Sequence, residues 1–281
     1  MTSAWDVYDA LIEDLPEDVT VTASHRGPRW TRVLNSADGV GSAWTMELSS
    51  RPALSAGLPD AGRPLRDVAA LVKSWNLAEA SVGLAAINSW YSKAEVAAEQ
   101  GFEETGAGTT WREVFEPYND VVEGQRVAVI GHYPFARKSL WKAGELEVLE
   151  RDVQAGDFPD TACEYLLPEA DWVFISSSAL VNKTAPRLIA LAADGGARTV
   201  MVGPSTPMHP VWLDLGVDTV TGWVADRFDR RKSGAVEAES AVVRDSLGWV
   251  LFRRGKLAEA RAELERATKT ATGAAEPLVW D

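Results

Sequence analysis

The sequence predicts an α/β protein in which a Rossmann-like domain with a parallel sheet follows an α+β domain. Two observations support this fold class. In the second half of the chain, four apolar runs alternate with segments of helix length, within residues 126–134, 145–152, 170–178 and 197–205. Strands that alternate with helices are typical of a parallel sheet. The first half instead places three strand patterns before two helical ones, which is the order of an α+β domain.

The first domain begins with a helix pattern over residues 4–14, whose apolar face carries Trp5, Tyr8, Leu11 and Ile12. Three strand patterns follow, separated by Gly, Pro, Asn and Asp turn residues, at residues 19–24, 29–34 and 42–48. Segments rich in Ala and Leu then predict helices over residues 64–75 and 77–92. We expect this domain to cover residues 1–122 and the Rossmann-like domain to cover residues 123–234.

The remaining residues, 235–281, contain a helical hairpin pattern at 244–268. Its spacing resembles one tetratricopeptide repeat, through Leu247, Gly248, Leu251, Gly255, Ala260, Leu264 and Ala267. A free-standing solenoid needs about three repeats, and the chain has one copy. We therefore expect the hairpin to pack on its own chain or on a twin subunit, which makes a homodimer the expected assembly. A peptide-binding surface is the alternative.

Composition narrows the classes of partner. The formal net charge is −13, which argues against nucleic acid and anionic membranes as main partners. No apolar run reaches the ~18 residues of a membrane-spanning helix, and the amino-terminal residues lack the pattern of a signal peptide. Cys163 is the single cysteine, so no internal disulfide is possible. We expect a cytoplasmic protein with a small-molecule ligand.

The turn after the first apolar run of the second domain carries Gly131 and His132, where a Rossmann protein holds its phosphate-binding loop. A single glycine does not make the GxGxxG fingerprint, so standard dinucleotide binding is not expected. Because the carboxyl ends of parallel strands form the ligand edge of such a sheet, His132 is a candidate general base, hydrogen-bond donor or metal ligand. Alternatively, it only bonds the backbone of the turn.

Polar residues follow the other strands of the predicted sheet. Glu150 lies 19 residues after Gly131, where an acid commonly binds the ribose of a nucleotide or of S-adenosylmethionine; a solvated strand-end carboxylate is the alternative. The next two loops carry further candidate ligand-binding or helix-capping groups, Ser177, Ser178, Asn182 and Thr184, then Gly203, Ser205 and Thr206. His132 and His209 both follow parallel strands and are the candidate metal ligands, although no CxxC or HExxH motif is present.

Several of these motifs together resemble a heavy-metal-chelation family of bacteria and archaea. They are GHYPF (131–135), residues 156–171, ALVNKT (179–184) and VGPSTPMHP (202–210), with GPRWTRV (27–33), GVGSAWTM (39–46) and VGLAAINSW (82–90) earlier. The resemblance covers residues 4–230 and implies an enolase-N-terminal-like domain before a Rossmann-like domain that is similar to methyltransferase folds. It places a site between the domains and assigns it Gly131, His132, Asn182, Thr184, Gly203, Ser205 and Thr206, with Asn88 from the first domain.

The leading functional hypothesis is an enzyme that acts on a small polar metabolite, by condensation, hydrolysis or group transfer, in the biosynthesis of a metal chelator, a siderophore or a pterin- or flavin-like cofactor. His132, Asn88 and Asn182 are the candidate catalytic residues, and the choice among lyase, hydrolase and transferase stays open. S-adenosylmethionine or a divalent metal is the candidate cofactor. The alternative is a non-catalytic protein that binds a heavy metal or a metal chelate, and a third possibility is an interaction module.

Overall fold

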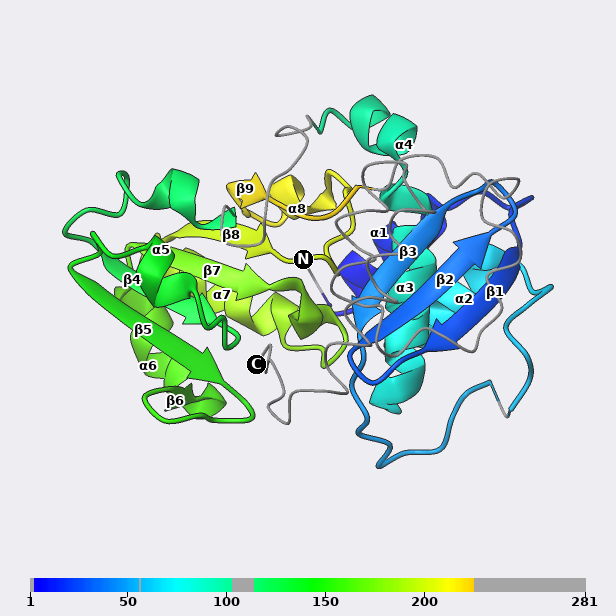
Figure 1. Cartoon of the computed structure of the whole chain (residues 1–281), viewed down its shortest axis with the longest axis horizontal. Helices are drawn as coiled ribbons and strands as arrows, with labels where there is room; N and C mark the ends of the chain where they lie inside the picture. Colours follow the sequence, from blue (N-terminus) through cyan, green and yellow to red (C-terminus); the bar gives the residue numbers. More distant parts are fainter. Residues whose placement is uncertain (1–2, 56, 103–113, 225–281) are drawn as a thin grey trace, which may run out of the picture. The chain divides into compact units, whose positions relative to one another are not determined.

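The computed structural model describes residues 3–55, 57–102 and 114–224 (Figure 1). The chain divides into two compact units. Among the described residues, the antiparallel unit contains residues 15–102, and the parallel unit contains residues 3–14 and 114–223. The first helix, α1 (Asp6–Glu13), thus belongs with the parallel sheet, although it precedes the antiparallel strands in sequence. The hairpin and tail predicted for residues 235–281 lie outside the described residues.

The antiparallel unit is a three-stranded sheet in the order β1-β2-β3, formed by β1 (Val21–Arg26), β2 (Trp30–Asn35) and β3 (Val40–Trp44). Its helices are α2 (Leu65–Ala69), the 3-10 turn η1 (Ala70–Lys73), α3 (Leu77–Tyr91) and α4 (Ala94–Glu99). The long helix α3 lies against the sheet (Figure 1). Gly41 permits this close approach, because a Cβ there would lie 2.1 Å from the carbonyl oxygen of Ala85.

The parallel unit is built on six strands in the order β6-β5-β4-β7-β8-β9, and every neighbouring pair is parallel. The strands are β4 (Arg126–Ile130), β5 (Glu145–Glu150), β6 (Phe158–Pro159), β7 (Trp172–Ser176), β8 (Arg198–Val202) and β9 (Thr219–Val220). Renumbered along this unit, the order is the 3-2-1-4-5-6 of Rossmann proteins. The predicted α/β class with a parallel sheet is confirmed, and so are its four longer strands. The two outermost strands have two residues each and were not predicted.

Helices cover both faces of the parallel sheet, which is why its strands have continuous apolar runs. Alternate residues of one face, including Val127, Val129 and Phe174, pack with Phe115 and with Leu140 beyond the short helix α5 (Ala136–Ser139). The connections contain η3 (Glu116–Tyr118), η4 (Asp160–Ala162), α6 (Cys163–Leu166), η5 (Leu167–Glu169), η6 (Ser177–Leu180), α7 (Ala185–Gly195) and α8 (Val211–Asp214). Helices α6 and α7 lie on the other face (Figure 1).

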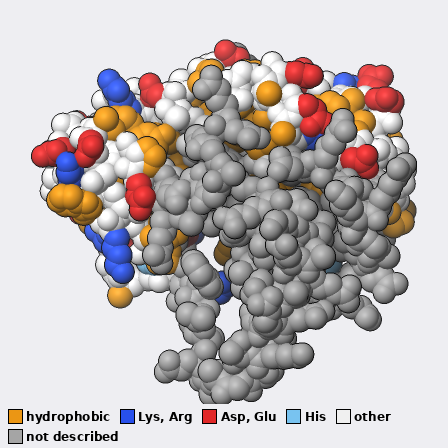
Figure 2. Space-filling view, turned by 45° about the horizontal axis from the view of Figure 1, so that its top comes forward, with side chains coloured by type: hydrophobic (Ala, Val, Ile, Leu, Met, Phe, Trp, Pro, Cys, Tyr) orange, Lys and Arg blue, Asp and Glu red, His pale blue; other side chains and the backbone are white. Residues whose placement is uncertain are grey.

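Helix α1 joins the parallel unit through its buried face. The Tyr8 hydroxyl donates a hydrogen bond to the carbonyl oxygen of Leu180 (3.0 Å), and burial raises the pKa of this phenol far above its ordinary value. Figure 2 shows acidic, basic and apolar side chains interspersed over the described part of one face of the molecule. Within the described residues, none of the helices is both long enough and apolar enough to cross a membrane.

Candidate functional site

The carboxyl ends of β4 and β7 are the first place to search for a site. These strands are neighbours in the centre of the sheet, and the chain leaves β4 towards β5 but leaves β7 towards β8. Such a reversal of strand order is a topological switch point, where open α/β sheets bind their ligands. At this edge β4 continues into Gly131, His132 and Tyr133, and β7 ends at Ser176.

Two glycines bring these strand ends together. Gly131 after β4 has a φ of 105°, and a Cβ there would lie 3.1 Å from the Cβ of Ser176. Gly203 after β8 has a φ of 120°, and its Cβ would lie 3.0 Å from Ser177 Oγ and 3.4 Å from the Tyr133 hydroxyl. Both positions therefore need glycine, for the backbone conformation and for space. We call the residues gathered here the carboxyl-end cluster: Gly131, His132, Tyr133, Asp157, Ser176, Ser177 and Gly203.

His132 pairs with a buried carboxylate in this cluster. Its Nδ1 lies 2.8 Å from Asp157 Oδ2, and the Asp157 side chain is 3% exposed whereas the His132 ring is 24% exposed. The same Asp157 oxygen accepts a hydrogen bond from the backbone N–H of Gln154 (3.2 Å). An ionised carboxylate only accepts, so in the neutral imidazole Nδ1 carries the proton and Nε2 keeps its lone pair. No described residue hydrogen-bonds Nε2, which leaves it available to a ligand.

Glu150 holds the same turn from the neighbouring strand. Its Oε2 accepts the backbone N–H of His132 (2.9 Å), and its Oε1 accepts the backbone N–H groups of Arg151 (2.6 Å) and Asp152 (3.4 Å). The carboxylate thus orients the backbone around His132. A ribose hydroxyl of S-adenosylmethionine would have to share this carboxylate with three backbone donors.

Tyr133 is a member of the cluster that sequence reasoning missed. Burial raises the pKa of its hydroxyl to about 12; a hydrogen bond with Ser176 opposes this rise and the charge of Glu150 adds to it. The phenol is therefore neutral and able to donate at ordinary pH. Its ring packs edge-on against Phe115, with ring centroids 5.3 Å apart. Nothing in the sequence distinguishes this tyrosine from an ordinary core aromatic residue.

The three serines at the end of β7 differ in their bonding. Ser176 Oγ and Ser178 Oγ share a hydrogen bond of 2.8 Å. Ser177 is 1% exposed, and its Oγ has no hydrogen-bond partner among the described residues. A buried hydroxyl without a partner costs about 1–3 kcal/mol. Ser177 Oγ is therefore the atom of the cluster with most to gain from a ligand.

The loops that follow use their predicted ligand-binding groups for local structure. Asn182 Oδ1 accepts hydrogen bonds from the backbone N–H (3.1 Å) and from the hydroxyl (2.6 Å) of Thr184, at the start of α7. Thr206 Oγ1 donates to the carbonyl oxygen of Gly203 (2.7 Å). Ser205 and Thr206 are 1% and 0% exposed. The hydrogen bonds of Asn182 and Thr206 are the local turn bonds that their residue types also favour.

Asn88 and His209 are engaged elsewhere. Asn88 is fully buried in α3 of the antiparallel unit and donates from Nδ2 to the carbonyl oxygen of Ser42 in β3 (2.8 Å). His209 uses both ring nitrogens, because Nε2 bonds Asp14 Oδ2 (3.0 Å) and Nδ1 accepts the backbone N–H of Val211 (3.1 Å). Its side chain is 5% exposed. The histidine fastens the segment after α1 to the loop after β8.

The donor atoms of the described residues do not fit a preformed heavy-metal centre. They include no group of three or more His, Cys, Asp and Glu side chains that could hold a metal ion. Heavy metals favour thiolate and imidazole ligands. The thiol of Cys163 is buried in α6, and burial, with the charge of Asp160, raises its pKa to about 11. His132 Nε2 is one imidazole nitrogen and does not make a site alone.

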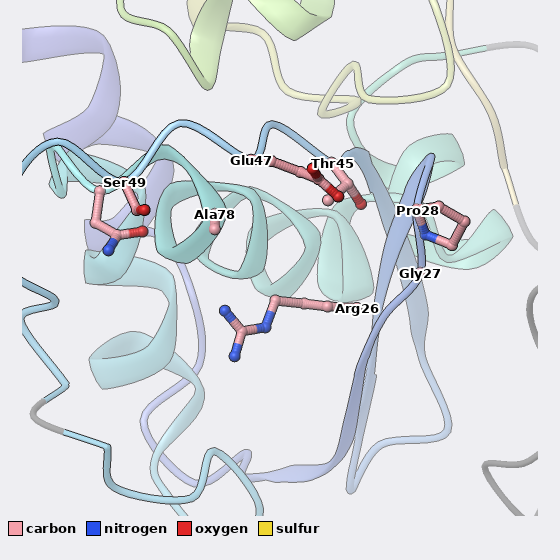
Figure 3. A pocket seen from close by; sticks show the side chains of 8 residues that line it. Arg26, Gly27, Pro28, Thr45, Glu47, Ser49 and Ala78 are labelled. Atoms are coloured by element: carbon pink, nitrogen blue, oxygen red, sulfur yellow. The ribbon is translucent and has the colours of Figure 1, made fainter.

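A separate hollow of about 510 Å³ lies in the antiparallel unit (Figure 3). Its lining residues come from the β1–β2 turn, from the chain after β3 and from the start of α3: Arg26, Gly27, Pro28, Thr45, Glu47, Ser49, Asn76 and Ala78. The side chains of Arg26 and Glu47 are both exposed and of opposite charge. This hollow offers charges and hydroxyl groups for binding, whereas the His132–Asp157 pair lies in the carboxyl-end cluster.

Comparison with known proteins gives the family. The model of the DUF364 family, described as "putative heavy-metal chelation", matches residues 113–240, and that of the DUF4213 family, with the same description, matches residues 8–91. A DUF364 protein of unknown function from Desulfitobacterium hafniense, solved as a crystal structure, is 35% identical with a TM-score of 0.70, over 80% of this chain and 88% of that one. The chain belongs to the DUF364 family. The family inferred from its sequence motifs is thereby confirmed.

A second DUF364 structure, from Pyrococcus horikoshii, is also of a protein of unknown function. It is 25% identical to this chain, with a TM-score of 0.58, and the match covers 75% of this chain and 82% of that one. A comparison with curated proteins finds no match. This DUF364 protein therefore shares its family and fold with solved relatives, while its activity has to be argued from its own residues.

Proposed function

We propose that this DUF364 protein is an enzyme that acts on a small polar metabolite at the carboxyl-end cluster, with His132 as general acid and base. One observation carries the proposal: Asp157 holds Nδ1 of His132 at 2.8 Å, and Nε2 has no partner among the described residues. A histidine whose second nitrogen bonds a carboxylate is oriented for proton transfer, because the carboxylate fixes the tautomer and stabilises the imidazolium.

The other cluster members supply binding and polarisation in this proposal. The neutral Tyr133 hydroxyl would donate to a substrate oxygen, and Ser177 Oγ would gain the hydrogen bond that it lacks. Glu150 would keep the His132 backbone in place. Proton transfer by His132 serves condensation, hydrolysis and group transfer alike. The family description, which names heavy-metal chelation, favours a substrate on the way to a metal chelator. A precursor of a pterin- or flavin-like cofactor is the substrate class that the sequence resemblance adds.

A second candidate function is the non-catalytic binding of a metal chelate, which brings most of its own ligands. The His132–Asp157 pair also supports this function, because metal-binding histidines commonly donate their other ring N–H to a carboxylate. In this case Nε2 of His132 would fill one open coordination position. The family description fits both candidate functions, so the identity of the bound species has to distinguish them.

Native mass spectrometry of untagged full-length protein, with metal analysis of the same sample, tests the proposal. An organic ligand that is lost on His132→Ala but retained on His25→Ala, a histidine of β1, supports the enzyme and provides its substrate scaffold. Stoichiometric metal in place of an organic ligand supports the second candidate. Once a substrate is known, Asp157→Asn should lower kcat by about 10²–10⁴-fold. Unchanged turnover in both His132→Ala and Asp157→Asn would show that the assignment is wrong.

A further inference from the structure

The hollow in the antiparallel unit shares no residue with the carboxyl-end cluster and has no part in the proposed function. Its volume of about 510 Å³ is in the range of small-molecule sites, ~300–1,000 Å³. Its walls come from the end of β1 and the turn after it, from the chain after β3, and from the start of α3 (Figure 3). A small molecule in the hollow would therefore contact three segments that lie apart in the sequence.

Two side chains of opposite charge line this hollow without pairing. Arg26 is the last residue of β1, and Glu47 follows β3. Within the described residues neither side chain forms a hydrogen bond or an ion pair, whereas Lys93 and Glu95 of the same unit pair at 3.1 Å. Figure 3 shows the guanidinium group of Arg26 apart from the carboxylate of Glu47. The hollow thus presents one cationic and one anionic group, and each can bind an opposite charge of a ligand.

The start of α3 adds a backbone donor to the hollow. The first N–H groups of a helix have no partner inside it and form the positive end of its dipole. The N–H of Leu77 donates to the carbonyl oxygen of Leu48 (2.8 Å). The N–H of Glu79 donates to the side chain of Asn76 (3.2 Å). Between them, the N–H of Ala78 has no partner among the described residues, and Ala78 lines the hollow, so an anionic ligand group is favoured there.

We infer that the hollow binds a free α-amino acid, with its carboxylate on Arg26 and the Ala78 N–H and its ammonium group on Glu47. A guanidinium group matches a carboxylate through two parallel hydrogen bonds. A simple anion such as phosphate would be repelled by Glu47, and a metal cation would be repelled by Arg26. The carboxylate of Glu79 does not line the hollow and accepts two backbone N–H groups of the preceding loop (both 2.7 Å). The inference goes beyond the proposed function, because no residue of the carboxyl-end cluster takes part.

Equilibrium dialysis of the full-length protein against a mixture of the standard L-amino acids tests this inference. Mass spectrometry of the two chambers identifies the amino acid that the protein retains, and we expect a Kd below about 1 mM. The matching 2-oxo acid lacks the ammonium group, and the matching decarboxylated amine lacks the carboxylate. Each analogue should bind at least about tenfold more weakly, because it loses one charge-assisted contact. Retention of no amino acid, or an equal affinity for either analogue, would overturn the inference.

Variants of the two charged residues locate the bound amino acid. Both side chains are exposed, so the fold should survive their replacement. Arg26→Gln and Glu47→Gln should each weaken binding at least about tenfold. The matched controls are Arg66→Gln and Glu95→Gln, whose native side chains form ion pairs outside the hollow at 3.0 Å and 3.1 Å, and they should leave the affinity unchanged. An unchanged affinity in Arg26→Gln or in Glu47→Gln would show that the hollow is not the site.

His132→Ala separates this inference from the proposed function. Binding in the hollow should not change in this variant, because His132 belongs to the parallel unit. An amino acid that is lost on His132→Ala but retained on Arg26→Gln would be bound in the carboxyl-end cluster, which would overturn the inference and support the proposed function. An amino acid that is retained on His132→Ala but lost on Arg26→Gln supports the inference, whatever the outcome for the proposed function.

Discussion

Asn35 in the antiparallel unit and the polar side chains of the carboxyl-end cluster serve different purposes. In the antiparallel unit, Asn35 donates from Nδ2 to the carbonyl oxygen (2.9 Å) and hydroxyl (3.0 Å) of Ser89 and accepts two backbone N–H groups at Oδ1, from Ala37 and Gly39 (both 2.9 Å). In the carboxyl-end cluster, polar side chains bond one another and leave His132 Nε2 and Ser177 Oγ without a described partner. Polar groups of the first kind complete the backbone, whereas those of the second kind can serve a ligand.

The largest expected effect is on the free energy of unfolding, and it distinguishes Asn35 from Asn182. Asn35→Ala should lower the free energy of unfolding of the antiparallel unit by about 3 kcal/mol, because it leaves buried donors and acceptors unpaired. Asn182→Ala removes only the two hydrogen bonds from Thr184 in the turn before α7, and should cost about 1 kcal/mol in the parallel unit. Urea titration read out by hydrogen exchange and mass spectrometry reports the two units separately.

Similar losses of stability in the two asparagine variants would contradict the comparison, since the buried network of Asn35 would then contribute no more than a partly buried turn. Asn35→Asp provides the matched control. It keeps the acceptor at Oδ1 but loses the two donor bonds to Ser89. The aspartate variant should therefore remain less stable than the native chain.

The next effect depends on pH and concerns Glu79 at the start of α3. Burial alone would raise the pKa of its carboxyl, but hydrogen bonds from Ser74 and from the backbone of Leu54 and Ser55 (both 2.7 Å) outweigh burial and lower it. A lowered pKa in the folded state stabilises the fold fully above the unfolded-state pKa near 4.5, and this contribution is lost as the pH falls through the lower folded-state value.

Glu79→Gln should therefore cost about 2 kcal/mol at pH 7 and should flatten the loss of stability on acidification. Glu95→Gln is the control in the same unit, because Glu95 is half-exposed and pairs with Lys93 at 3.1 Å, a type of surface contact worth about 0–1 kcal/mol. Thermal unfolding of the three proteins between pH 3 and pH 7 measures both effects. Parallel curves for Glu79→Gln and the native chain would show that this carboxylate contributes nothing to the pH dependence.

The sequence predicts much of the fold because its strongest patterns are local. Residues 127–130 form a continuous apolar run that is buried on both faces, and such a run predicts a central parallel strand. The strands β6 and β9 have two residues each, so their pairing comes from the neighbouring strand and leaves no pattern. The place of α1 beside the parallel sheet depends on contacts such as Tyr8 with Leu180, which lie 172 positions apart.

The candidate site was predictable in position but only partly in composition. The strand ends that carry Gly131 and His132 follow from the alternation of strands and helices. Asp157 was missed because its role depends on a contact with His132, which lies in another loop. Tyr133 was missed because its role depends on burial. Neither feature leaves a characteristic spacing in the sequence. Two aspartates follow β5 within four residues of each other, and their sequence does not distinguish them. In the structure Asp160 bonds Arg187 at 3.1 Å, whereas Asp157 pairs with His132.

The smallest effect on stability should come from Ser177→Ala, which sharpens the comparison between the two units. Removal of a buried hydroxyl without a partner should leave the free energy of unfolding unchanged or raise it by up to about 1 kcal/mol. Ser89→Ala in α3 removes an equally buried hydroxyl that donates to the carbonyl oxygen of Ala86 (2.7 Å) and accepts from Asn35, and should cost about 1.5 kcal/mol. Calorimetry of both variants measures the difference. An equal loss in Ser177→Ala would mean that its hydroxyl is bonded in solution, so that it serves the fold as Ser89 does and is not available to a ligand.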